Sequence, residues 1–333
     1  MATSLRRSDT TLEYEGQGEA KPRHAPERYE EANPRDPASG YIASRPLADA
    51  VNAALFLRQP LLITGEPGTG KTMLAHSIAW EFDLPLHIFH TKMNSGGADL
   101  FYRYDALLEF RDSHTVQGNG HSVDPRKYVN YSALGSAILD SHPASAVEQY
   151  VRPDHRLAAE PTASVVLIDE IDKAPRDFPN DILFETERLS FHVKETGWTI
   201  TANPDHWPIV ICTSNLERSL PDAFLRRCVF FHIEFPDEDE LTKIVRQRVG
   251  SVGVNGSDML REGIRLFNDV RRNDRLLKKP ATSEMLQWLR LAEKRGITAD
   301  DLRVRASRVV STLPALLKTK EDLDLVRPMF SAR

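Results

Sequence analysis

The chain has 333 residues, with 43 Lys and Arg against 48 Asp and Glu, and its formal net charge is −5. Apolar residues make up 41% and charged residues 27% of the sequence, a balance typical of globular proteins that excludes collagen-like, disulfide-rich and wholly disordered chains. A dedicated nucleic-acid binder usually carries a basic excess, so the mildly acidic charge argues against that class.

Patterns of membrane insertion and secretion are not found in the sequence. No apolar run approaches the roughly 18 residues that a membrane span needs. Arg6 and Arg7 near the start are not followed by the apolar core of a secretory signal. Cys212 and Cys228 lie in apolar segments, as expected of buried thiols in a reducing compartment. We therefore expect a cytoplasmic protein without a membrane span.

The first part of the chain has the composition of a flexible arm. Residues 1–40 are polar, rich in Glu, Arg and Pro, and contain few groups that a folded domain would bury. Beyond this arm, Val51, Ala54 and Leu55 recur at helical spacing before Pro60 ends the pattern. We predict that the folded part begins at residue 41.

Five short apolar runs lie between residues 60 and 235, and each has the length of a buried strand. They cover residues 61–64, 86–90, 165–168, 208–213 and 229–233. Helical stretches separate them, as where Leu74, Ile78 and Phe82 share one face. Continuous apolar strands that alternate with helices indicate a parallel sheet covered on both faces. We predict one α/β domain over residues 41–236.

After Pro236 the strand patterns stop and helical patterns take over. Leu241, Ile244 and Val245 fall on one helical face, and Met285 with Leu289 marks a later helix. We predict a small helical domain over residues 237–333.

The turn after the first predicted strand carries a phosphate-binding sequence. It fits the pattern G-x-x-x-x-G-K-[ST] with the residues Gly65, Glu66, Pro67, Gly68, Thr69, Gly70, Lys71 and Thr72. The glycines let backbone N–H groups turn toward phosphate oxygens, and the following helix adds its positive N-terminal end. Lys71 is then placed to reach the β- and γ-phosphates, and the Thr72 hydroxyl to ligate Mg²⁺.

Two carboxylates follow the third predicted strand. Asp169 and Glu170 come directly after residues 165–168, at the end of the strand where parallel sheets bind ligands. We expect Asp169 to hold Mg²⁺, directly or through water, and Glu170 to act as general base toward the water that attacks the γ-phosphate. The alternative is that both carboxylates cap a following helix and pair with Lys173.

Polar residues also flank the last two predicted strands. Asn215, after the fourth strand, either hydrogen-bonds the γ-phosphate or the attacking water, or forms a turn. Arg226 and Arg227 precede the fifth strand. In a ring, an Arg of one subunit can reach the γ-phosphate of its neighbour, whereas on an isolated chain such a pair forms surface ion pairs.

Together these elements resemble an AAA+ ATPase, and in detail the MoxR branch. The similarity covers about residues 41–236, and the lid more loosely. It rests on residues 41–43 and 47–52, the phosphate loop, and residues 169–175, 180–187, 191–201 and 220–227. It implies a P-loop NTPase fold with a five-stranded parallel sheet in the order 5-1-4-3-2 and a C-terminal helical lid. It also implies ATP and Mg²⁺ as cofactors, Asn215 as sensor 1, and Arg227 rather than Arg226 as the arginine finger.

The same resemblance implies how the chain works. Members of the branch form hexameric rings with nucleotide at each subunit interface and remodel protein partners, commonly beside a protein with a von Willebrand factor A domain. We thus expect a Mg²⁺-dependent ATPase with a chaperone-like action on a protein. The alternative is a DNA-linked AAA+ NTPase, such as a loader or a restriction-type subunit. The residues alone do not distinguish ATP from GTP.

The sequence departs from this family at the start of a lid helix. Glu284 stands where the family usually places the sensor 2 Arg. An acidic residue in a first helical turn is an ordinary cap. Lys278 or Lys279 would then be left to supply the missing charge.

The connection over residues 92–162 is long. Phe101, Tyr102 and Tyr104 follow the second predicted strand, where AAA+ proteins often carry a loop that grips a substrate. These aromatic side chains either form such a loop or pack the insertion against the core.

Overall fold

The computed structural model describes residues 41–116, 124–155, 157–249 and 256–330. The flexible arm predicted for residues 1–40 lies outside these described residues. Within them, no helix has both the length and the apolar character needed to cross a membrane.

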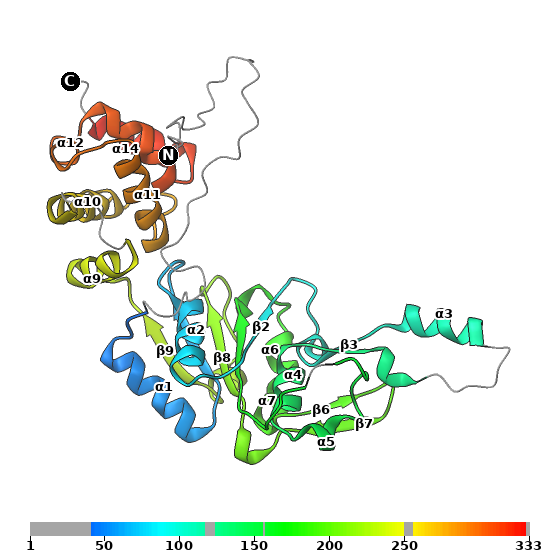
Figure 1. Ribbon diagram of the computed structural model, residues 1–333. Coiled ribbons are helices and arrows are strands. Elements are labelled where there is room, and N and C mark those ends of the chain that lie inside the picture. The colour runs from blue at the N-terminus through cyan, green and yellow to red at the C-terminus, as the bar shows by residue number, and fades with distance from the viewer. Residues whose placement is uncertain (1–40, 117–123, 156, 250–255, 331–333) are drawn as a thin grey trace, which may run out of the picture. The chain divides into compact units, whose positions relative to one another are not determined.

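Five parallel strands form the main sheet (Figure 1). They are β1 (Leu61–Gly65), β2 (Leu86–His90), β5 (Val165–Asp169), β8 (Ile209–Ser214) and β9 (Val229–Ile233). Their order across the sheet is β9-β1-β8-β5-β2, and all four neighbouring pairs are parallel. Numbered along the chain, these five strands have the order 5-1-4-3-2, so the predicted fold class is confirmed.

Helices cover both faces of this sheet (Figure 1). One face carries α1 (Arg45–Leu57) and α2 (Lys71–Glu81). The other face carries α4 (Ala133–Asp140), α5 (Ala144–Val147), α6 (Phe178–Asp181), α7 (Leu183–Arg188) and α8 (Asp222–Leu225). Because side chains alternate along a strand, Leu61 and Ile63 of β1 pack toward α1 and α2, while Leu62 packs toward the opposite layer. Both faces are therefore buried, which explains the continuous apolar runs.

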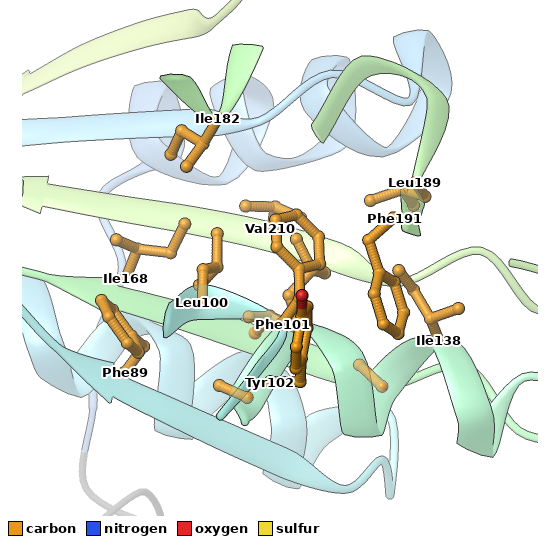
Figure 2. Packing of buried hydrophobic residues seen from close by; sticks show 14 of the residues in the cluster. Phe89, Leu100, Phe101, Tyr102, Ile138, Ile168, Ile182, Leu189, Phe191 and Val210 are labelled. Carbon is orange, nitrogen blue, oxygen red and sulfur yellow. The ribbon is translucent and has the colours of Figure 1, made fainter. Parts of the chain in front are cut away.

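The larger core fills the layer on the α4 side of the sheet (Figure 2). Ile168 and Val210 come from the sheet, and Ile138 from α4. Phe101 stacks on Phe191 with ring centroids 5.2 Å apart. This packing fixes the strands whose ends carry the predicted site residues.

Two small antiparallel ribbons and one helix elaborate the α/β part. The ribbons pair β3 (Tyr102–Tyr104) with β4 (Val129–Tyr131), and β6 (Ser190–Val193) with β7 (Trp198–Thr201). The helix α3 (Ala106–Val116) lies between β3 and β4, and 3-10 turns cover Gly97–Leu100, Pro125–Lys127, Ile171–Lys173 and Pro204–His206. Phe101 and Tyr102 are buried, and Tyr104 is partly buried. These aromatic side chains thus pack the insertion against the core.

The described residues after β9 contain helices and no strands. They form α9 (Glu238–Val249), α10 (Gly256–Arg271), α11 (Thr282–Lys294), α12 (Ala299–Arg303), α13 (Leu313–Leu316) and α14 (Lys320–Val326), with 3-10 turns at Ser307–Thr312 and Arg327–Met329. A separate core joins them around Phe267 and Trp288, both fully buried. The Trp288 indole N–H donates to the Thr312 hydroxyl at 2.9 Å.

Gly135 allows α4 to lie directly against the backbone before β3. A Cβ atom at this position would be 2.0 Å from the carbonyl oxygen of Phe101. We predict that Gly135→Ala lowers the free energy of unfolding by about 1–3 kcal/mol, because overpacking outweighs the gain in helix propensity. Urea denaturation measures this difference. Gly96→Ala is the matched control, since the nearest atom to its added Cβ is 3.8 Å away. An equal loss in both variants would contradict the packing argument.

Candidate nucleotide-binding site

The phosphate loop joins β1 to α2 through left-handed glycines. Gly68 has φ +76° and Gly70 has φ +91°, a region that glycine enters without steric cost. No side chain caps the first turn of α2, so its backbone N–H groups remain available to an anion. The loop therefore has the backbone geometry of a phosphate cradle.

The ammonium group of Lys71 lies inside this loop. Its Nζ donates to the carbonyl oxygens of Gly65 and Glu66, at 2.8 Å each, and the side chain is buried. Burial lowers the pKa of Lys71, and the negative charge of Asp172 and Asp169 opposes that shift. The carboxylates thus help to keep a buried cation charged at the centre of the site.

Asp169 links three segments of the chain at the end of β5. Its Oδ1 accepts hydrogen bonds from the hydroxyls of Thr72, at 3.0 Å, and Thr213, at 2.7 Å. Nδ1 of His90, at the end of β2, lies 3.4 Å from Oδ2. The structure therefore brings together the two residues predicted to hold Mg²⁺, Thr72 and Asp169.

Glu170 follows Asp169 in a left-handed conformation, with φ +56°. Its Oε1 accepts from the Asn215 side-chain amide at 3.3 Å, and its Oε2 lies 2.6 Å from Lys173 Nζ. Contact with this carboxylate raises the pKa of Lys173. Glu170 does pair with Lys173, but its side chain does not cap the following turn. Its carboxylate is held between a cation and an amide.

Asp172 is a buried carboxylate that organises the segment after β8. Its two oxygens accept from the backbone N–H of Asn215, at 3.3 and 3.2 Å, and one also accepts from that of Glu217 at 2.9 Å. Asp172 thereby fixes the backbone from which the Asn215 amide reaches Glu170.

One cavity of about 300 Å³ lies among the phosphate loop, Asp169, Glu170 and Asn215. The phosphate loop, the ends of β5 and β8, and Ser283 at the start of α11 line it. A hydroxyl and a carboxylate are oxygen ligands of the kind that Mg²⁺ prefers, and Mg²⁺ takes its remaining ligands from phosphates and water. The described residues contain no cluster of three or more His, Cys, Asp or Glu that would hold a metal alone. The donor set therefore fits Mg²⁺ bound together with a nucleotide triphosphate.

A comparison with models of protein families identifies the family to which this fold belongs. The sequence model described as the ATPase family associated with various cellular activities, AAA, matches residues 61–237, more than half of the chain. The chain belongs to the AAA family. The matched segment of this AAA protein runs from β1, through the phosphate loop and all five strands of the main sheet, to the residue before α9.

One solved structure shows a distant similarity to this chain. A solved structure of the Thermotoga maritima RuvB Holliday junction branch migration motor shares 15% sequence identity with the AAA chain, with a TM-score of 0.43. The match covers 84% of this chain and 70% of that one. No curated protein matches the sequence.

The two arginines before β9 lie apart from the cavity of this AAA chain. Neither Arg226 nor Arg227 is among the residues that line it. Arg227 Nε contacts a carboxylate oxygen of Glu187 on α7 at 3.3 Å, and its Nη1 donates to the carbonyl oxygen of Ala223 at 3.0 Å. The structure thus places Lys71, Asn215 and Glu170 together and leaves Arg227 outside their group.

Glu284 acts as a cap at the start of α11. Its Oε2 accepts from the backbone N–H of Ala281 at 3.0 Å and from the Ser283 hydroxyl at 3.1 Å. Of the two lysines considered for the missing charge, Lys279 contacts Asp274 at 3.4 Å.

A different cation of the helical region contacts the phosphate loop. Arg271, at the end of α10, pairs with the Glu66 carboxylate through Nη2 and donates from Nη1 to the carbonyl oxygen of Pro280 at 2.6 Å. Its guanidinium also lies over the ring of Phe235, 3.5 Å from the centroid. No pattern in the sequence indicated this contact.

The sequence patterns also did not predict a role for three further residues of the site: Thr91, Asp172 and Thr213. Thr91 donates from its hydroxyl to the backbone oxygens of Asp169, at 2.8 Å, and Glu170. The strands on either side of β5 each have a threonine near their carboxyl end: Thr91 directly after β2, and Thr213 in β8. This pattern could have identified both residues from the sequence. The sequence gives a weaker indication of the role of Asp172, because the residues whose N–H groups donate to it lie far along the chain.

We predict that Asp172→Ala lowers the free energy of unfolding by about 1–3 kcal/mol, because two backbone N–H groups lose a charged acceptor. Chemical denaturation measures the loss. Asp177→Ala is the matched control, since Asp177 is exposed and its side chain caps nothing. A control variant as unstable as Asp172→Ala would show that the hydrogen bonds are not the cause.

Proposed function

We propose that this chain is a MoxR-type AAA+ ATPase that assembles into a hexameric ring and uses Mg²⁺-dependent ATP hydrolysis to remodel or activate a protein partner. Residues 41–236 form its nucleotide-binding domain, and residues 237–333 form its lid. The partner is a protein, such as one with a von Willebrand factor A domain. The sequence resemblance to the MoxR branch and the geometry of the cavity support this function.

One observation carries the proposal: the Thr72 hydroxyl donates to the Asp169 carboxylate at 3.0 Å, beside the buried Lys71 ammonium. Thr72 follows β1 and Asp169 ends β5, so the fold brings a hydroxyl and a carboxylate together at one edge of the sheet. Mg²⁺ bound between these residues would neutralise charge on the β- and γ-phosphates.

The remaining residues have roles that follow from their positions. Residues 65–72 bind the phosphates through backbone N–H groups, and Lys71 adds positive charge. The Glu170 carboxylate accepts a proton from the attacking water and orients it toward the γ-phosphate. Asn215 sets the direction of that carboxylate through its amide. These residues bind and orient the reactants, as phosphoryl transfer requires.

Arg227 acts on the neighbouring subunit in this proposal. It lies outside the cavity of its own chain, so a contribution to hydrolysis requires a second copy whose cavity faces it. An Arg supplied across an interface stabilises charge in the transition state and is typically worth 10³–10⁵ in rate. Hydrolysis and assembly are therefore coupled.

The general base is tested by Glu170→Gln. We expect this variant to bind ATP within a few-fold of wild type and to hydrolyse it roughly 10²–10⁴-fold more slowly, because only proton transfer is removed. Phosphate release and binding of a fluorescent ATP analogue measure the two properties. Glu148→Gln, an exposed change outside the site, should keep wild-type turnover. Rapid hydrolysis by Glu170→Gln would remove Glu170 from this role.

The arginine finger is tested by Arg227→Ala, with Arg226→Ala as the adjacent control. We expect Arg227→Ala to bind ATP normally and to lose turnover by roughly 10³-fold or more, while Arg226→Ala remains active. Mixing Arg227→Ala with Lys71→Ala subunits should restore activity, because mixed interfaces combine an intact cavity with an intact finger. No recovery on mixing, from variants that assemble, would contradict action across the interface.

The class of partner is tested with the same ATP-retaining Glu170→Gln chain. Binding of a protein with a von Willebrand factor A domain to the ATP-loaded ring, and stimulation of wild-type turnover by that protein, support the proposal. Stimulation by DNA and not by protein supports the DNA-linked alternative.

A further inference from the structure

We infer that Thr213 is a positioning residue for hydrolysis, which sets both the Asp169 carboxylate and the Glu170 backbone through one buried hydroxyl. This inference rests on the proposed roles of Asp169 and Glu170. Thr213 lines the cavity, and the role inferred for it is to act through Asp169 and Glu170.

The Thr213 hydroxyl both donates and accepts a hydrogen bond. It donates to Asp169 Oδ1 at 2.7 Å and accepts from the backbone N–H of Glu170 at 2.9 Å. A threonine hydroxyl has one proton to donate and lone pairs to accept, so both bonds form at once. Thr213 is 1% exposed, which excludes water as a ready substitute for either bond.

The sheet places Thr213 at this point. β8 pairs with β5 in parallel, and the register matches Ile168 with Cys212. The next residues on the two strands are Asp169 and Thr213, so the hydroxyl comes from the strand beside the carboxylate. The position of Thr213 is thus set by the main sheet and not by a loop.

The backbone of Glu170 needs such support. Its φ of +56° is left-handed, a conformation that persists in a non-glycine residue only where neighbouring groups hold it. Thr213 holds the N–H of Glu170, and the Thr91 hydroxyl holds the carbonyl oxygen. The peptide groups before and after Glu170 are therefore both held by hydrogen bonds. They fix the direction in which the Glu170 side chain points from the backbone.

Thr213 differs from the other groups that contact this turn. Thr91 contacts backbone oxygens of Asp169 and Glu170, and His90 contacts the Asp169 side chain from an exposed position. The Thr213 hydroxyl joins a side chain expected at the metal to the backbone of the expected base. Its loss therefore disturbs both groups together.

The test compares Thr213→Val, which removes the hydroxyl at nearly constant shape, with Thr213→Ser, which restores it. We expect Thr213→Val to lower kcat roughly 10–100-fold, the usual effect of losing an outer-shell partner, with the KM for ATP within about threefold of wild type. Thr213→Ser should recover most of kcat. Thr186→Val is the matched control, because the buried Thr186 hydroxyl bonds to backbone oxygens of its own helix segment.

A second readout needs neither nucleotide nor turnover. Hydrogen–deuterium exchange of the peptide over residues 165–172 reports the Glu170 amide, which we expect to exchange roughly tenfold faster in Thr213→Val and at the wild-type rate in Thr213→Ser. Unfolding temperatures of the same samples show whether each variant is folded.

Wild-type kcat or wild-type exchange in Thr213→Val would overturn the inference, as would equal damage in Thr213→Ser. A fall in ATP affinity at unchanged kcat would also overturn it. These outcomes are distinct from failure of the proposed function, which an inactive wild-type ring or an active Glu170→Gln chain would show. If the proposed function fails, the exchange measurement still shows whether the Thr213 hydroxyl holds the Glu170 amide.

Discussion

The Asp169 carboxylate is the contact on which the candidate site depends. Its Oδ1 accepts hydrogen bonds from Thr72, which follows β1, and from Thr213, which belongs to β8. β8 lies between β1 and β5 in the sheet. A single carboxylate oxygen at the end of β5 therefore joins the start of α2 to β8, and a shift in the register of β5 against β8 would separate the Thr213 hydroxyl from it.

Charge balance explains why the buried groups are tolerated together. A buried ammonium without partners would lose its proton, and burial does lower the pKa of Lys71. Asp172 and Asp169 offset this effect, while Lys71 in turn compensates carboxylates that would otherwise repel one another. Both oxygens of Asp172 accept from backbone N–H groups, and Asp172 is not among the residues that line the cavity, so its charge belongs to the framework of the site. The opposite charges of Lys71 and these two carboxylates thus compensate one another within the site.

Patterns within short stretches of sequence were enough to predict the main sheet and the phosphate loop. A buried strand, a glycine turn and a helix are local features, and the order of the strands followed from the family resemblance. The contacts of Thr213 and Arg271 were not predictable in this way. Thr213 lies 44 residues from Asp169, and Arg271 lies 205 residues from Glu66. The cap at Glu284 was foreseen as one alternative, because Glu284 lies only three residues from Ala281, whose backbone N–H donates to it.

The cap formed by Glu284 limits where positive charge can come from in the proposed reaction. Its carboxylate is engaged by Ala281 and Ser283, so the start of α11 offers the cavity a hydroxyl and no cation. Arg271 is likewise engaged, by the Glu66 carboxylate at the edge of the loop. Within one chain, Lys71 is then the cation that lines the cavity among the described residues. Among the described residues, Lys71 is therefore the cation through which this chain can meet charge that develops in the cavity. In the proposed ring, this is why Arg227 of a neighbouring copy is given the task of stabilising that charge.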